Sequence, residues 1–171
     1  MKLWKPFPGV ISSKDTTILK YFRLIEKLQG RFPLGYGPGS GRWNPYGVPV
    51  IYACSHSALN FLELLSIKGP VVSLAHWSLV QFELDIEIPY LSMEDLPQDW
   101  SNRPHPKSTQ EIGAYWAGSK ETLALKIPSC RIPLINYPEE HNLLLNPLHP
   151  DFSKKVRLIE ITEVSFAINN L

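Results

Sequence analysis

The sequence predicts a single α+β domain, and three observations lead to that fold class. The chain has 171 residues, which suits one domain with a sizeable core. Its hydrophobic fraction of 44% and charged fraction of 19% are typical of a globular protein. Short strand-like runs and two segments of helical spacing follow one another without a linker. We therefore expect one domain over residues 1–171, with several strands and two or three helices.

The N-terminal third contains a long loop between two apolar segments. Residues 1–15 are expected to form an irregular arm. The run Ile18–Leu28 fits a strand or a short helix, and its periodicity does not decide between them. Six glycines and three prolines over Gly30–Gly47 predict a loop, and loops of this length are usually functional or disordered. The aromatic residues within it favour order. Val48–Ala53 then predicts a buried strand.

A helix is predicted directly after this strand. Ser55 or Ser57 suits the N-cap, and apolar residues follow at helical spacing from Ala58 to Leu65. Glu63 lies within this helix, near its apolar side. Because carboxylates are rarely buried without a partner, Glu63 is either exposed or paired in a site.

The remainder of the chain predicts further strands and one more helix. Leu79–Ile88 alternates with period two and fits a half-exposed strand, and Pro89–Pro106 fits a polar connection. Ser108–Trp116 predicts a helix with Ser108 or Thr109 as its cap and Glu111 in the first turn. Four short strand-like runs are separated by Pro, Asn or Asp: Leu123–Ile127, Arg131–Ile135, His141–Leu145 and Lys155–Ile161.

Composition and charge exclude several functional classes. The net charge is +1, from 17 basic and 16 acidic side chains, and without a basic stripe we expect no direct nucleic-acid binding. No apolar run reaches the length of a membrane span, and the N-terminus lacks the apolar core of a secretion signal. We therefore expect a cytoplasmic protein. Cys54 and Cys130 do not form a disulfide framework and suit buried positions.

Metal-site and nucleophile motifs do not emerge from the sequence. The five histidines form no HExxH motif, and the cysteines have no zinc-ligand spacing, so we expect no metal. Cys54 and His56 could act as nucleophile and base, but the strand gives way to the helix between them, which does not secure the geometry. The glycine-rich loop lacks the GK[ST] ending of a P-loop.

Four polar residues stand where burial would cost free energy. Arg42 in the glycine-rich loop is either a surface charge or a bidentate ligand for a phosphate or diphosphate. Arg23, between two apolar residues, fits a structural ion pair or a site. Tyr52 is either an ordinary aromatic residue of the core or a site residue with a polar hydroxyl at its tip. Composition alone would assign each of these residues, and Glu63, an ordinary structural or surface role.

The order of these residues resembles the RES-domain family, named for characteristic Arg, Glu and Ser positions. The matching pieces run from about Tyr21 to Arg157, which is most of the chain, and several motifs in a fixed order make the resemblance specific. They are Arg23, the segment GRWNPYGVPVIYACS, the helix with Glu63, KIPS ending at Ser129, and HNLLLNPLHPDF over residues 141–152.

The resemblance implies a fold, an activity and a partner. The fold would be similar to that of the diphtheria-toxin-like ADP-ribosyltransferases, with a split mixed β-sheet core. The activity would be that of a toxin which cleaves the nicotinamide–ribose bond of NAD, as a glycohydrolase or phosphorylase. ADP-ribosyl transfer to a protein and non-catalytic nucleotide binding are the alternatives. NAD would be a substrate, without a prosthetic group. The partner would be an Xre-like helix-turn-helix antitoxin, or an immunity protein if the chain is a delivered effector.

The resemblance also implies roles for individual residues. Arg42, Tyr52, Glu63 and Ser129 would form the catalytic set, with Glu63 stabilising the charge on the ribose. The residues expected to contact NAD or shape its site are Arg23, Arg42, Trp43, Asn44, Tyr52, Ser129, Asn142 and Asn146.

Two segments depart from the family pattern. Ser40 replaces the first glycine of the common GGRWN motif. The Pro-rich connection from Ser92 to His105 matches no family motif.

Overall fold

The computed structural model describes residues 18–167, which contain six strands and three α-helices. The irregular arm predicted for residues 1–15 lies outside this range. The strands are β1 (Leu19–Glu26), β2 (Ile51–Cys54), β3 (Trp77–Leu84), β4 (Ala124–Ile127), β5 (Asn142–Leu145) and β6 (Val156–Val164). The helices are α1 (Ser57–Lys68), α2 (Lys107–Ser119) and α3 (Phe152–Lys155). Short 3₁₀ segments cover Gly69–Leu74, Met93–Asp95 and Leu134–Asn136.

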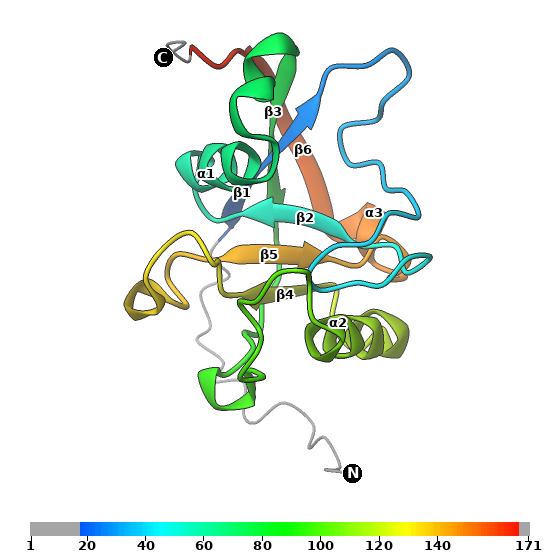
Figure 1. The fold of residues 1–171 in the computed structure, drawn as a ribbon. Helices are drawn as coiled ribbons and strands as arrows, with labels where there is room; N and C mark the ends of the chain where they lie inside the picture. The colour runs from blue at the N-terminus through cyan, green and yellow to red at the C-terminus, as the bar shows by residue number, and fades with distance from the viewer. Residues whose placement is uncertain (1–17, 168–171) are drawn as a thin grey trace.

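The strands form one sheet in the order β4-β5-β2-β1-β3-β6, and neighbouring strands are antiparallel. β1 and β2 pair only at Phe22 and Cys54, so the sheet splits there. Figure 1 shows that the two halves run in different directions. The predicted single α+β domain with a split sheet is confirmed. In the described part of the chain, the one parallel pairing is the isolated bridge between Tyr90 and Lys126.

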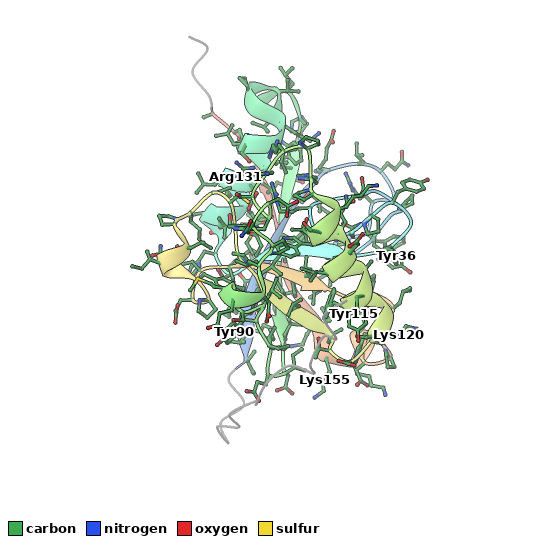
Figure 2. The ribbon with its side chains drawn as sticks, turned by 60° about the horizontal axis from the view of Figure 1, so that its bottom comes forward. Tyr36, Tyr90, Tyr115, Lys120, Arg131 and Lys155 are labelled. Atoms are coloured by element: carbon green, nitrogen blue, oxygen red, sulfur yellow. The ribbon has the colours of Figure 1, made fainter. Side chains whose placement is uncertain are left out.

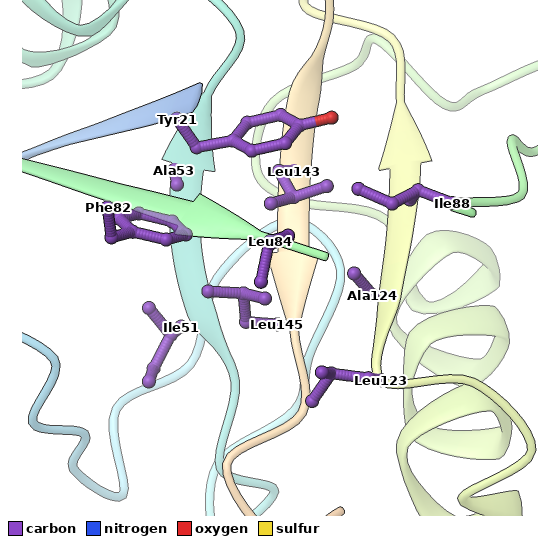
Figure 3. Packing of buried hydrophobic residues seen from close by; sticks show 10 residues of the cluster. All are labelled: Tyr21, Ile51, Ala53, Phe82, Leu84, Ile88, Leu123, Ala124, Leu143 and Leu145. Atoms are coloured by element: carbon purple, nitrogen blue, oxygen red, sulfur yellow. The ribbon is translucent and has the colours of Figure 1, made fainter. Parts of the chain in front are cut away.

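The two faces of the sheet bury different apolar clusters. On one face, the β1–β3 half packs against the β2–β5–β4 half through Phe82, Leu84, Ile51 and Leu143, as Figure 3 shows. Side chains alternate between faces along a strand, so the neighbouring residues form the second cluster. There, Trp116 and Ala117 of α2 pack on β4 and β5 with Tyr52 at the border. This second face carries the candidate site.

Most predicted strands are present, and one is absent. The run Ile18–Leu28 is a strand rather than a helix, and the runs ending at Ala53, Ile127, Leu145 and Ile161 all contain strands. The strand predicted over Arg131–Ile135 is wrong. The hydroxyl of Ser129 accepts a hydrogen bond from the Arg131 N–H at 2.9 Å, which closes a turn, and Pro133 has no N–H for a ladder.

The predicted helix caps are wrong, although both helices exist. His56 is the N-cap residue of α1 and makes no side-chain cap bond. Ser55 is engaged elsewhere, because its Oγ accepts from the N–H of His141. At α2, Pro106 is the N-cap residue, and the first turn holds no acidic residue. The hydroxyl of Ser108 instead donates to Asp99 at 2.6 Å.

His141 is a buried neutral histidine just before β5. Its Nδ1 lies 2.7 Å from the carbonyl oxygen of Pro138, which assigns the ring proton to Nδ1. Its Nε2 then accepts from the Tyr21 hydroxyl at 3.1 Å. Burial, together with the positive charge of Lys126, lowers the pKa of His141 to about 4.

This histidine predicts a pH dependence of stability. The unfolded state takes up a proton near the ordinary histidine pKa of about 6.5, whereas the folded state does so only near 4. Its contribution is therefore complete above pH 6.5 and falls by about 3 kcal/mol as the pH drops to 4. Denaturant unfolding across this range should show a shallower loss in His141→Gln. The exposed control His76→Gln should follow the wild type, and identical profiles for all three proteins would contradict the assignment.

Candidate functional site

A cavity of about 420 Å³ lies on the sheet face that carries Tyr52 and Cys54. β1 contributes Leu24, and β5 contributes Asn142. α1 adds Asn60, Glu63, Leu64 and Ile67, while the loop before β2 adds residues 40–43. Two further loops supply residues 103, 105, 128, 130 and 131. The cavity thus adjoins the split between β1 and β2, where the sheet pairing is weakest.

Glu63 supplies the carboxylate of this cavity, and neighbouring side chains hold it in place. One carboxylate oxygen accepts from the Ser129 hydroxyl at 2.7 Å and from the Asn142 amide at 2.6 Å. The other lies 3.5 Å from the Nε of Arg131. The side chain of Glu63 remains 23% exposed. Glu63 is therefore fixed in orientation from one side and open to a ligand on the other.

Asn142 and Ser129, the two residues that bind Glu63, are themselves fixed by their surroundings. The thiol of Cys54 lies 3.2 Å from the amide oxygen of Asn142, so it turns the amide nitrogen toward Glu63. Burial, with the charge of Glu63 as a second cause, raises the pKa of Cys54 well above its usual value. The thiol thus remains protonated and can donate. Ser129 is 2% exposed and does not line the cavity, so it acts on Glu63 from behind.

Tyr52 closes the base of the loop before β2. Its hydroxyl donates to the side-chain oxygen of Asn44 at 2.7 Å and accepts from the N–H of Trp43 at 3.0 Å. Asn44 in turn donates to the carbonyl groups of Gly39 and Val48. Asn44 is thus a structural residue of the loop, whereas Tyr52 and the buried Trp43 both line the cavity.

Removal of the Tyr52 hydroxyl should destabilise the loop. In Tyr52→Phe, the N–H of Trp43 and the side-chain oxygen of Asn44, both buried residues, lose their partner, which costs about 1–3 kcal/mol. Chemical denaturation should show this loss of stability. The control Tyr46→Phe removes a hydroxyl from a residue that is 77% exposed, and it should behave as the wild type. Equal stability of both variants would refute the bridging role.

Helix α2 fixes the backbone of the same loop. Thr109 donates to the carbonyl of Arg42 at 2.7 Å, and Gln110 donates to the carbonyl of Gly41 at 2.9 Å. A Cβ on Gly113 would lie 1.6 Å from the carbonyl oxygen of Trp43. The loop backbone therefore packs directly on the helix at Gly113, where there is no side chain to keep it away.

Arg42 lines the cavity, but its guanidinium also holds a second loop. Its Nη1 donates to the carbonyl oxygens of Trp100 and Asn102. Arg42 is thus not a simple surface charge, because its guanidinium anchors the loop that contains Trp100 and Asn102.

Two residues predicted for the site lie outside the cavity lining. Arg23 alternates with Leu24 along β1, so it projects from the opposite face, and its Nη1 donates to the carbonyl oxygens of Pro33 and Gly35. Asn146 is buried and donates to the carbonyl of Ala117 at the end of α2. The structure therefore brings together Arg42, Trp43, Tyr52, Glu63 and Asn142, with Ser129 behind Glu63 and Asn44 behind Tyr52.

Sequence reasoning missed several cavity residues, which are Asn60, Arg103, His105, Cys130 and Arg131. Arg131 carried a usable signal, because it is a charge two residues after Ser129 in an otherwise apolar segment. Arg103 and His105 lie in the connection that matched no family motif. Burial, followed by the charges of Arg42, Arg103 and Arg131, lowers the pKa of His105.

Within residues 18–167, no group of three or more His, Cys, Asp or Glu side chains is placed to hold a metal ion. The described helices also include none that is long and apolar enough to cross a membrane.

Comparisons with known proteins identify the family from the sequence, and a solved structure shows a similar fold. A family model described as RES domain matches residues 20–168. "Toxin Res" of Yersinia enterocolitica is 36% identical over 138 residues, covering 79% of this chain and 86% of the relative. "Prs ADP-ribosylating toxin" of Sphingobium sp. is 37% identical over 117 residues, covering 65% and 68%. The M. tuberculosis MbcT–MbcA toxin–antitoxin complex contains a similar fold, with a TM-score of 0.67, 15% identity, and coverage of 88% of this chain and 86% of that one.

Proposed function

We propose that this chain, which belongs to the RES domain family, is a toxin that cleaves the nicotinamide–ribose bond of NAD. The observation that carries the proposal is the partly buried carboxylate of Glu63, held by Ser129 and Asn142 in a cavity lined by arginines. A carboxylate fixed in this way suits a reaction that develops positive charge on a sugar.

The chemistry follows from the bond that breaks. The electron pair of the C1′–N bond leaves with the pyridinium nitrogen, giving neutral nicotinamide and an oxocarbenium-like ribose. Glu63 stabilises the positive charge on the ribose or holds a ribose hydroxyl. The nucleophilic oxygen of water or phosphate then bonds to C1′ and releases its proton. Tyr52 and Trp43 provide an aromatic wall against which the nicotinamide or its ribose packs.

The volume and charge of the cavity support a dinucleotide substrate. Three guanidinium groups and one carboxylate line it, so its wall attracts anions. A cavity of about 420 Å³ is within the size range of small-molecule sites, roughly 300–1,000 Å³.

Nicotinamide release tests the proposal directly. Purified protein is incubated with NAD, with and without inorganic phosphate, and free nicotinamide is measured by chromatography. We expect release in at least one buffer. ADP-ribose as the second product identifies water as the acceptor, and ADP-ribose 1″-phosphate identifies phosphate. Folded protein that releases no nicotinamide in either buffer, or with cell lysate, would overturn it.

A second candidate is ADP-ribosyl transfer to a protein, which is favoured by the name of the Sphingobium relative. Labelled NAD and cell lysate should then give a discrete labelled protein band, and loss of that band in Glu63→Gln would assign it to this site. A uniformly unlabelled lysate would exclude this candidate under the conditions tested.

We also propose an antitoxin as the protein partner, because the structural neighbour was solved as a toxin–antitoxin complex. An enzyme that depletes NAD would harm its own cell without a neutralising protein. Co-expression with the product of a neighbouring helix-turn-helix gene should restore growth and stop nicotinamide release.

A further inference from the structure

We propose that Arg103 and Arg131 bind a phosphoryl oxyanion in the cavity, above all the diphosphate of the dinucleotide, while Arg42 positions the loop that carries Arg103. The inference rests on the proposed function and names the residues that would recognise its substrate.

Arg42 is the anchor of this arrangement. Its Nη1 binds the carbonyl oxygens of Trp100 and Asn102, directly before Arg103. Its own carbonyl accepts from Thr109, directly after the same loop. Arg42 therefore holds both ends of the segment 100–109. Because two carbonyl oxygens already engage its Nη1, fewer of the Arg42 guanidinium donors remain for an anion.

Arg103 has its donors available. It lines the cavity, its residue is exposed, and it makes no hydrogen bond or ion pair within the described residues. A guanidinium presents five N–H donors in a planar fork that matches phosphate oxygens. Without an ion-pair partner in the protein, Arg103 can direct this fork to a ligand.

Arg131 has one donor that the protein leaves unsatisfied. Its Nε is buried and has no hydrogen-bond partner, although it lies at ion-pair distance, 3.5 Å, from a carboxylate oxygen of Glu63. Figure 2 shows Arg131 beside α1, the helix that carries Glu63. A buried unsatisfied N–H is costly, and a ligand oxygen would relieve that cost.

The three guanidinium groups converge on one region. Cys130 and His105 both line the cavity, and both are within electrostatic range of Arg42, Arg103 and Arg131. The single carboxylate among the lining residues, Glu63, leaves the positive charge in excess. An oxyanion between Arg103 and Arg131 would balance this excess close to Glu63, which is where a dinucleotide places its diphosphate relative to the reacting ribose.

The test compares substrates with and without phosphate groups. Arg103→Gln, Arg131→Gln and the control Arg31→Gln, an exposed arginine outside the cavity lining, are assayed with NAD and with nicotinamide riboside. In phosphate-free buffer, each cavity variant should raise KM for NAD by about 10-fold or more, as expected for a charge-assisted hydrogen bond. Turnover of the riboside by Arg103→Gln should change less than about 2-fold, and Arg31→Gln should match the wild type. Arg131→Gln should slow the riboside as well, because it also removes the ion pair to Glu63.

Other outcomes separate the alternatives. A higher KM for inorganic phosphate, with KM for NAD unchanged, would place the acceptor phosphate rather than the diphosphate on these arginines. Equal losses with both substrates in Arg103→Gln, or no loss with either, would overturn the inference.

Binding of ADP by calorimetry is independent of turnover. If the wild type releases no nicotinamide yet binds ADP, and Arg103→Gln binds at least about 10-fold more weakly, the oxyanion site stands although the proposed activity fails. Equal ADP affinity in the wild type and both variants would overturn the site.

Discussion

Glu63→Gln is expected to lower nicotinamide release from NAD by at least about 100-fold, the loss typical of a removed electrostatic stabiliser. The amide oxygen of glutamine can still accept from Ser129 and Asn142, so the side chain keeps its place. The negative charge that would stabilise an oxocarbenium-like ribose is lost. Chromatographic measurement of kcat at saturating NAD would report this change.

The control for this variant is Glu111→Gln, which removes a charge from the exposed face of α2. It should retain wild-type turnover, and thermal unfolding should be similar for all three proteins. NAD binding should persist in Glu63→Gln. If this variant keeps more than about a tenth of the wild-type rate, Glu63 does not supply the stabilisation that we assign to it.

Gly113→Ala should cause the largest loss of stability among the substitutions considered. A Cβ would lie 1.6 Å from the carbonyl oxygen of Trp43, which is backbone and has little room to move. The added methyl group should push α2 away from the loop and lower the free energy of unfolding by about 3 kcal/mol, the upper end of the usual cost of overpacking. It should also disturb Trp43 and Tyr52 in the cavity wall. Chemical denaturation and nicotinamide release would measure the two effects.

Gly118→Ala is the matched control, because it lies in the same helix with no atom within 4 Å of an added Cβ. Alanine is the better helix former, so this variant should gain up to about 1 kcal/mol. A Gly113→Ala protein as stable and active as Gly118→Ala would contradict the close approach of helix and loop.

The strands could be predicted where the pattern was set by burial. In β1, Tyr21 and Ile25 are buried on one face while their neighbours are less so, and this alternation appears in the sequence. Most of β2, up to Ala53, and all of β5 were similarly visible as apolar runs. The failures have local causes. Arg131–Ile135 looks like a strand by composition, but the Ser129 hydroxyl closes a turn and Pro133 cannot join a ladder.

The candidate site was predictable as a set of residue types rather than as an arrangement. The resemblance placed Glu63, Ser129 and Asn142 in one site, and the structure joins them by hydrogen bonds. It could not reveal that Arg23 lies on the opposite face of the sheet, since that depends on the register of β1. Nor could it reveal that Arg42 anchors a loop 58 residues further along the chain.

That Arg103 and Arg131 line the same cavity could not be predicted from the sequence, for a related reason. Both residues lie in loops whose sequences have little periodicity. The sequence therefore does not indicate which side chains these loops bring to the cavity. Only the folded chain brings residues 42, 103 and 131 to one wall. The connection that matched no family motif thus contributes to the site through its position in space.

The most direct test of the central claim is a comparison of nicotinamide release from NAD by wild type and Glu63→Gln, at equal concentrations of folded protein. The account predicts steady release by the wild type in phosphate-containing or phosphate-free buffer, and at least about 100-fold slower release by the variant. Intact NAD after incubation with the folded wild type, or equal release by the two proteins, would contradict it.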